Sequence, residues 1–247
     1  MLIVANWKAY VEDFGKAKKL FAVSKKLARE TGITIVLAPS APLLGALALR
    51  NKSKVSFAAQ DVSATTGGAE TGEVTAQAYA ATGATYAIIG HSERRAAGDT
   101  DATVAEKLAH ALAHGLTPIL CIGESERDSE GQYLAVVREE LTRAIESLAP
   151  KERAEVIVAY EPLWAIGKTA SAAIGPNDLA EMVLYIRKVL AELLPGKSSA
   201  RSSVLYGGSV EVENVRDLAA NSGVDGFLVG HESIDPHTFI LLIRQLA

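Results

Sequence analysis

The chain has 247 residues, of which 49% are hydrophobic and 22% charged, and its formal net charge is −4. This length can bury the core of one large domain or two small ones, and the mild acidity gives no reason to expect nucleic acid or an acidic membrane surface as a partner. The one cysteine, Cys121, excludes an internal disulfide and fits a reducing compartment.

Short apolar runs alternate along the chain with longer stretches rich in alanine, leucine and charged residues. The runs predict eight strands, over Leu2–Ala5, Thr34–Ala38, Val55–Ala59, Tyr86–Ile89, Pro118–Ile122, Val156–Tyr160, Ser203–Leu205 and Gly226–Val229. The stretches between them carry apolar residues at three- and four-residue spacing and predict helices, among them Gly15–Arg29, Ala102–His114, Gln132–Leu148, Asp178–Leu193 and Pro236–Leu246. The strands show no alternation of apolar and polar residues, which indicates a parallel sheet buried on both faces.

Eight strand–helix units in about 250 residues match an α/β fold, a (β/α)8 TIM barrel built as a single domain over residues 1–247. A doubly wound open sheet is the competing architecture. It would usually carry a G-x-G-x-x-G turn after the first strand, and the segment from Ala5 to Tyr10 is no such turn.

The first apolar stretch, from Met1 to Ala5, is too short for a signal peptide, and no basic region precedes it. No apolar run approaches the roughly 20 residues of a membrane span. We therefore expect a cytoplasmic protein with no membrane or nucleic-acid partner.

Most of the predicted strands end in a chemically capable group. These groups are Asn6 and Lys8 after the first strand, Gln60 after the third, His91 after the fourth, Glu161 after the sixth, Gly207-Gly208-Ser209 after the seventh and Gly230-His231 after the eighth. In a closed barrel the carboxyl ends of all strands meet on one rim, where barrel enzymes keep their active sites. We therefore expect these groups to share one pocket.

Glu161 has the features of a catalytic base. It ends a buried strand beside apolar side chains, and poor solvation disfavours its charged form, which makes it a stronger base than a surface glutamate. Pro162 stiffens the exit from the strand and Gly167 lets the next loop bend, which predicts a hinged lid. The alternative is an ordinary strand-end glutamate that is solvated by water.

His91 and Lys8 are the candidate partners of this base. A helix that begins after His91 would disfavour an imidazolium, so the ring would stay neutral and could donate or shuttle a proton. Lys8 would supply positive charge to an anionic substrate or oxyanion if it points inward. The alternatives are a buried histidine whose hydrogen bonds go to the backbone and a solvated lysine on the rim.

Two glycine-containing turns follow the last two strands, at Ser209 and at Gly230. Free backbone N–H groups in such turns bind phosphate, and this is the usual phosphate site of barrel enzymes. A base, a neutral proton donor, a cation and a phosphate anchor suit proton abstraction next to a carbonyl, through an enediolate, on a small phosphorylated sugar. The scattered histidines and the lone Cys121, which we interpret as a core residue, predict no metal site.

Five segments of the sequence resemble the triosephosphate isomerase family, in the family's order and spacing and over essentially the whole chain. They are Asn6-Trp7-Lys8, Gly90-His91-Ser92-Glu93-Arg94-Arg95, Cys121-Ile122-Gly123-Glu124, Ala159-Tyr160-Glu161-Pro162-Leu163-Trp164-Ala165-Ile166-Gly167 and Tyr206-Gly207-Gly208-Ser209-Val210. That family is itself the standard example of a glutamate base, a neutral histidine electrophile and a closing loop.

The resemblance implies interconversion of dihydroxyacetone phosphate and glyceraldehyde 3-phosphate, in glycolysis and gluconeogenesis, without a cofactor or metal. It implies that Glu161 moves the proton and that His91 polarises and protonates the oxygens. It also implies that Lys8 and Asn6 stabilise negative charge, and that Glu93 keeps the site residues in position without touching the substrate. It further implies phosphate binding by Gly167, Ser209, Gly230 and the backbone of His231, together with a lid latch at Tyr206.

The resemblance also implies a homodimer joined through the third loop, which runs from Gln60 to Glu73 and includes Thr71 at the position that would reach toward the neighbour's site. Glu70 stands where the family often has an aromatic residue or histidine, so we expect a more polar interface.

The sequence departs from the family pattern at three places. Lys168 follows Gly167 directly, without the usual Thr-Gly, and the last turn reads Gly230-His231-Glu232-Ser233 where the family commonly has Gly-Gly-Ala-Ser. Ala5 and Tyr10 replace a glycine and an asparagine, which we interpret as packing changes. Two alternatives stay open: a different phosphosugar barrel enzyme, such as a Schiff-base aldolase, and a non-catalytic barrel descendant kept for binding.

Overall fold

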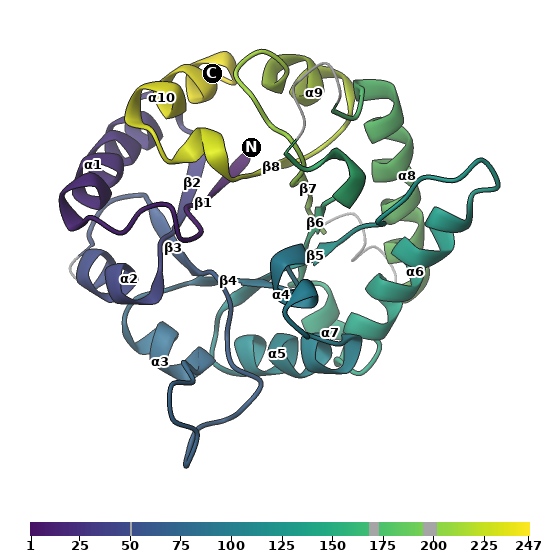
Figure 1. Ribbon diagram of the computed structural model, residues 1–247, viewed down its shortest axis with the longest axis horizontal. Coiled ribbons are helices and arrows are strands. Elements are labelled where there is room, and N and C mark those ends of the chain that lie inside the picture. Colours follow the sequence, from purple (N-terminus) through teal and green to yellow (C-terminus); the bar gives the residue numbers. More distant parts are fainter. Residues whose placement is uncertain (50, 168–172, 195–201) are drawn as a thin grey trace.

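The computed structural model describes residues 1–49, 51–167, 173–194 and 202–247 as a closed barrel of eight parallel strands (Figure 1). The strands are β1 (Leu2–Asn6), β2 (Thr34–Ala38), β3 (Ser56–Ala59), β4 (Tyr86–Ile89), β5 (Thr117–Ile122), β6 (Ile157–Tyr160), β7 (Val204–Tyr206) and β8 (Gly226–Val229). Each strand pairs with the next along the chain, and β8 closes onto β1 with Leu2 opposite Gly226. The predicted (β/α)8 barrel is confirmed, and the strand ends differ from the prediction by a single residue.

Helices surround the barrel, and the short helix α4 lies nearer the centre of the view (Figure 1). They are α1 (Phe14–Thr31), α2 (Ala41–Ala48), α3 (Ala76–Ala81), α4 (Ser92–Ala96), α5 (Asp101–Ala113), α6 (Gln132–Ile145), α7 (Pro150–Arg153), α8 (Pro176–Leu193), α9 (Val215–Asn221) and α10 (Pro236–Gln245), with short 3-10 turns η1 (Leu163–Ala165) and η4 (His231–Ser233). Capping fixes where α1 begins, because the side chain of Asp13 accepts a hydrogen bond from the Lys16 N–H at 2.7 Å.

Two apolar layers hold the barrel together. Along β1, Ile3 and Ala5 belong to the large cluster between the strands and the surrounding helices, whereas Val4 belongs to a smaller cluster inside the barrel. The interior cluster consists of Val4, Val36, Ala38, Ala58, Ile88, Ile119, Cys121, Ala159, Leu205 and Leu228. Both faces of the strands are therefore buried, which explains why their sequences do not alternate.

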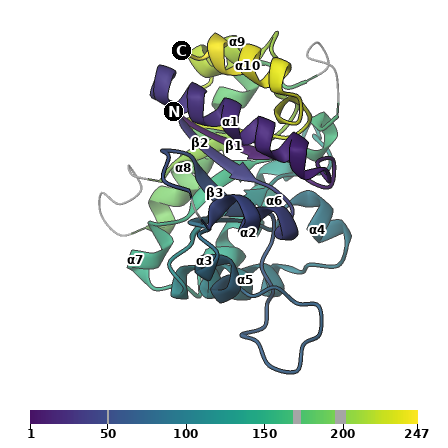
Figure 2. The same ribbon diagram turned by 90° about the vertical axis from the view of Figure 1, so that its left-hand side faces the viewer.

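The third loop, residues 60–75 between β3 and α3, projects from the side of the barrel in both views (Figure 1, Figure 2). Its base is closed by a hydrogen bond of 3.0 Å from the Ser63 N–H to the carbonyl of Val74. Residues 66–74 are all exposed. Among the described helices, none combines the length and the apolar character that crossing a bilayer requires.

Candidate active site

A cavity of about 460 Å³ lies at the carboxyl ends of the strands. It is lined by nine of the ten predicted site residues, namely Asn6, Lys8, His91, Glu93, Glu161, Gly167, Ser209, Gly230 and His231. Asn6 ends β1, and the others lie in the segments after β1, β4, β6, β7 and β8, so closure of the barrel brings together groups more than 150 residues apart in sequence.

Glu161 follows β6 directly and is 2% exposed. Its Oε1 lies 3.4 Å from His91 Nε2, and its Oε2 accepts a hydrogen bond of 3.4 Å from the Ser92 N–H. Burial raises the pKa of Glu161, and the opposing effects of His91, the Ser92 N–H and Lys8 do not cancel that rise. A β-carbon at position 207 would stand 2.8 Å from the Glu161 Cγ, so Gly207 gives the carboxylate its space.

His91 precedes α4 and caps its first turn. Its Nδ1 accepts a hydrogen bond of 3.1 Å from the Glu93 N–H. A ring nitrogen that accepts a hydrogen bond carries no proton, so the proton of the neutral ring lies on Nε2, the atom that faces Glu161. The cap therefore sets both the orientation and the tautomer of this histidine.

Lys8 crosses the cavity and forms an ion pair with Glu93, with 2.7 Å between its Nζ and Glu93 Oε1. Desolvation raises the pKa of Glu93, but the hydrogen bond and charge of Lys8 outweigh it, and the pKa falls below its usual value. The backbone of Lys8 has a φ of 45°, the one positive value at a non-glycine residue in the described part of the chain. The Asn6 side chain accepts from its N–H at 3.1 Å and Gln60 donates to its carbonyl at 2.8 Å, which hold this strained conformation.

The phosphate end of the predicted site combines the turns after β7 and β8. The Ser209 hydroxyl donates a hydrogen bond of 2.8 Å to the carbonyl of Ala165, which connects the β7 turn to the start of the lid. At the β8 turn, a β-carbon on Gly230 would stand 3.7 Å from Lys8 Cε, and the His231 ring meets the Tyr10 ring edge-on with 6.2 Å between centroids. Tyr10, which the sequence suggested only as a packing change, also lines the cavity.

Tyr206 is the predicted site residue that does not line the cavity. It belongs to β7 and is fully buried, and burial raises the pKa of its phenol. Its hydroxyl packs against Gly208, where a β-carbon would clash with it at 2.3 Å. The predicted lid departure at Lys168 lies outside the described residues, so the latch stays a prediction.

The sequence analysis assigned no role to Glu124, which the structure places under the first turn of the lid. This carboxylate is 1% exposed, and its Oε1 accepts hydrogen bonds of 2.8 Å from both the Tyr160 hydroxyl and the Trp164 indole. The sequence did contain a signal for a role of Glu124 at the site, because this residue lies just after the end of β5, as Glu161 lies just after the end of β6. Cys121, interpreted as a core residue, is buried in the cluster inside the barrel, and burial together with the charge of Glu161 raises the pKa of its thiol.

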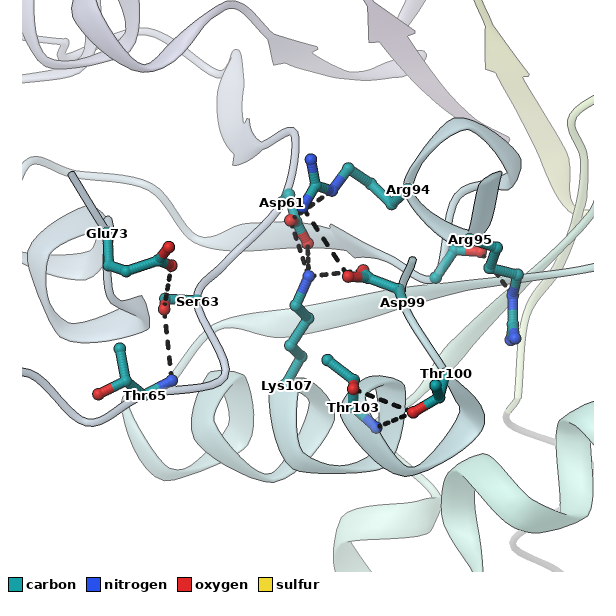
Figure 3. A network of polar contacts seen from close by, with 11 residues as sticks. Asp61, Ser63, Thr65, Glu73, Arg94, Arg95, Asp99, Thr100, Thr103 and Lys107 are labelled. Atoms are coloured by element: carbon teal, nitrogen blue, oxygen red, sulfur yellow. Dashed lines mark hydrogen bonds and ion pairs between the residues drawn. The ribbon is translucent and has the colours of Figure 1, made fainter. Parts of the chain in front are cut away.

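A second polar network joins the third loop to the helices next to His91 (Figure 3). The ammonium group of Lys107, in α5 and 3% exposed, lies between Asp61 and Asp99, at 2.8 Å and 2.6 Å from their nearest carboxylate oxygens. Arg94 of α4 adds an ion pair to Asp61 at 2.9 Å. Glu93 and Arg94 therefore tie the same short helix to the cavity on one side and to the third loop on the other.

Comparison with known proteins identifies the family. The family model described as triosephosphate isomerase matches residues 1–246. The chain belongs to the triosephosphate isomerase family. The triosephosphate isomerase of Thermus thermophilus is 39% identical over 247 residues, which cover 99% of this chain and 98% of that protein.

Two further triosephosphate isomerases agree. The protein of Symbiobacterium thermophilum is 38% identical over 249 residues, covering 100% of this chain and 96% of its own length. The protein of Nocardia farcinica is 39% identical over 251 residues, covering 98% of this chain and 94% of its own length. The resemblance noted in the sequence is thus confirmed, and the cavity belongs to a barrel of the triosephosphate isomerase family.

Proposed function

We propose that this chain interconverts dihydroxyacetone phosphate and D-glyceraldehyde 3-phosphate, as its family membership implies, with Glu161 as the base. The observation that carries the mechanism is the distance of 3.4 Å between Glu161 Oε1 and His91 Nε2 inside the cavity. A base and a proton donor at this separation can act on adjacent atoms of one small substrate.

In the proposed reaction Glu161 removes a proton from carbon 1 of dihydroxyacetone phosphate, and the electron pair of that C–H bond forms the double bond of the enediolate. The Nε2–H of His91 polarises the carbonyl oxygen and moves protons between the two substrate oxygens. The Glu161 carboxyl then returns its proton to carbon 2, which yields glyceraldehyde 3-phosphate. The raised pKa of Glu161 suits both directions, because the group must be a good base and then a good acid.

The remaining site residues stabilise the negative charge of the enediolate and bind the phosphate group. Asn6 and Lys8 stabilise negative charge on the substrate and the enediolate, and Glu93 keeps the Lys8 ammonium in place through their 2.7 Å contact. Gly167, Ser209, Gly230 and the backbone of His231 bind the phosphate, and Tyr206 latches the lid that keeps water from the intermediate. No cofactor or metal takes part in this scheme.

We further propose that the active form is a homodimer in which the third loop of each subunit docks on the other, with Thr71 reaching toward the neighbour's site. The projection of the loop and the exposure of residues 66–74 support this arrangement. The reaction belongs to glycolysis and gluconeogenesis, and we place the protein in the cytoplasm.

The decisive experiment is steady-state isomerisation of glyceraldehyde 3-phosphate by the wild type and by Glu161→Gln. Loss of the base should lower kcat by roughly 10²–10⁴-fold. Glu155→Gln is the matched control, because this exposed glutamate lies just before the other end of β6. A slow wild type that Glu161→Gln hardly changes would overturn the isomerase mechanism and favour a binding role.

A further inference from the structure

The turn after β8 places an acidic residue in the wall of the cavity. Glu232, in η4, lines the same cavity as Lys8, Gly230 and His231. It is partly buried, and none of the ion pairs between described residues includes its carboxylate. In the described part of the chain, therefore, no lysine or arginine forms an ion pair with this carboxylate at the phosphate end of the cavity.

The surroundings of Glu232 add to this negative charge. Burial raises its pKa, the positive charge of His231 opposes that rise, and Glu211, Glu213 and Asp235 reinforce it. The His231 ring is turned toward Tyr10 of the β1 loop. The charges that act on Glu232 in the described structure include three carboxylates and one histidine, and Lys8 and Tyr10 line the same cavity.

We propose that Glu232 is a specificity-determining residue that lowers the affinity of the pocket for the phosphate group. It would thereby reduce the ratio of kcat/KM for a phosphorylated triose to kcat/KM for an unphosphorylated one. A carboxylate beside a bound dianion repels it, and the repulsion is strongest where burial limits the screening by water. The same repulsion favours departure of the phosphorylated product, since it acts on every bound triose phosphate alike. The inference rests on the proposed placement of the phosphate at this turn.

Glu232→Gln keeps the shape of the side chain and removes its charge. For a partly exposed pair we expect the KM for glyceraldehyde 3-phosphate and the inhibition constant of sulfate to fall roughly 3- to 10-fold, and the change to shrink as ionic strength rises. Sulfate is the probe because it is a dianion at every pH used and has no carbon skeleton to contact Glu161. The ratio of kcat/KM for glyceraldehyde 3-phosphate to kcat/KM for D-glyceraldehyde should rise by a similar factor.

Glu213→Gln is the matched control, because this carboxylate acts on Glu232 but does not line the cavity. It should change sulfate inhibition much less than Glu232→Gln does. Equal effects of the two variants would mean that only the general negative potential matters, and the specific role of Glu232 would be wrong.

Ser209→Ala separates failure of this inference from failure of the phosphate site itself. If Ser209→Ala weakens sulfate inhibition while Glu232→Gln leaves it unchanged, the phosphate binds here and Glu232 has no role in it. If neither variant changes sulfate inhibition, Glu232 does not repel the bound anion and the inference is wrong. Sulfate that does not compete with glyceraldehyde 3-phosphate in the wild type would show that the phosphate binds elsewhere, and both assignments would be wrong. Circular dichroism and the unfolding midpoint of each variant show that the change in sulfate inhibition does not come from misfolding.

Discussion

Burial of Glu161 has opposite consequences for activity and for stability. It raises the pKa of the carboxyl, which makes the ionised form a stronger base. A pKa that is higher in the folded than in the unfolded state means that folding favours the protonated form. The contribution to stability is therefore present below the unfolded pKa and is lost as the pH rises through the folded pKa. At neutral pH the buried, ionised carboxylate of Glu161 therefore lowers the stability of the folded protein.

Glu161→Gln should accordingly unfold at a higher temperature than the wild type at pH 7, although it is the variant with the lowest activity. The advantage should shrink as the pH is lowered through the pKa of Glu161, because both side chains are then neutral. In a domain of this size each kcal/mol shifts the unfolding midpoint by about 2–4 °C, which calorimetry across a pH series resolves. A variant less stable than the wild type at pH 7 would show that the His91 and Ser92 contacts of the carboxylate outweigh its desolvation.

The roles of single residues could be predicted from sequence where one local pattern placed the residue at the site. A polar group at the end of a buried run placed Glu161, His91 and Lys8 on a common rim, and the structure brings them into one cavity. The hydrogen bond between Glu124 and the Trp164 indole was not predicted, because it depends on how the lid folds back over β5 rather than on any spacing along the chain.

At the scale of elements, α4 stands out as a junction although it has only five residues. Its N-terminal end is capped by His91, Glu93 reaches Lys8, and Arg94 reaches Asp61 in the third loop. The sequence analysis considered a helix that begins after His91 but gave it no bounds, since five residues show no measurable periodicity. The long helices, by contrast, were predicted to within a few residues because each buries a repeating apolar face.

Lys107→Met tests how much this junction depends on the network in Figure 3. The change leaves Asp99 and part of Asp61 without a buried partner, so we expect a loss of roughly 2–4 kcal/mol in the free energy of unfolding, measured by urea denaturation. Lys19→Met, at an exposed position of α1, should have little effect. Adding Asp61→Asn to Lys107→Met should recover part of the loss. If it recovers nothing, the cost comes from packing and not from unpaired charge.

At the scale of the whole molecule, the third loop is the feature that a lone barrel leaves unexplained. It exposes residues 66–74 on a projection that buries little of its own surface (Figure 2). Segments of this kind are stabilised by a partner surface or remain costly to order. The sequence could predict the closed barrel from eight repeated units, but a contact between two copies has no counterpart in the periodicity of one chain.

Thr71→Arg should disrupt the proposed dimer, because a bulky charge at the loop tip would have to be buried against the neighbouring subunit. We expect sedimentation to show monomers at micromolar concentration and kcat to fall by at least tenfold, a loss of about 1.4 kcal/mol or more in transition-state stabilisation. Thr34→Arg, exposed at the opposite end of the barrel, should change neither property. A fully active Thr71→Arg monomer would contradict the proposed assembly.

The closure of β8 onto β1 also determines how this molecule can fail. An open sheet presents an edge of unpaired N–H and C=O groups to which a strand of another chain can add, and such edges promote aggregation. In the described barrel every strand has a neighbour on both sides. Two adjacent strands must therefore separate before an unpaired strand edge is exposed. The first step toward aggregation is this local opening of the barrel, and not a collision between intact molecules.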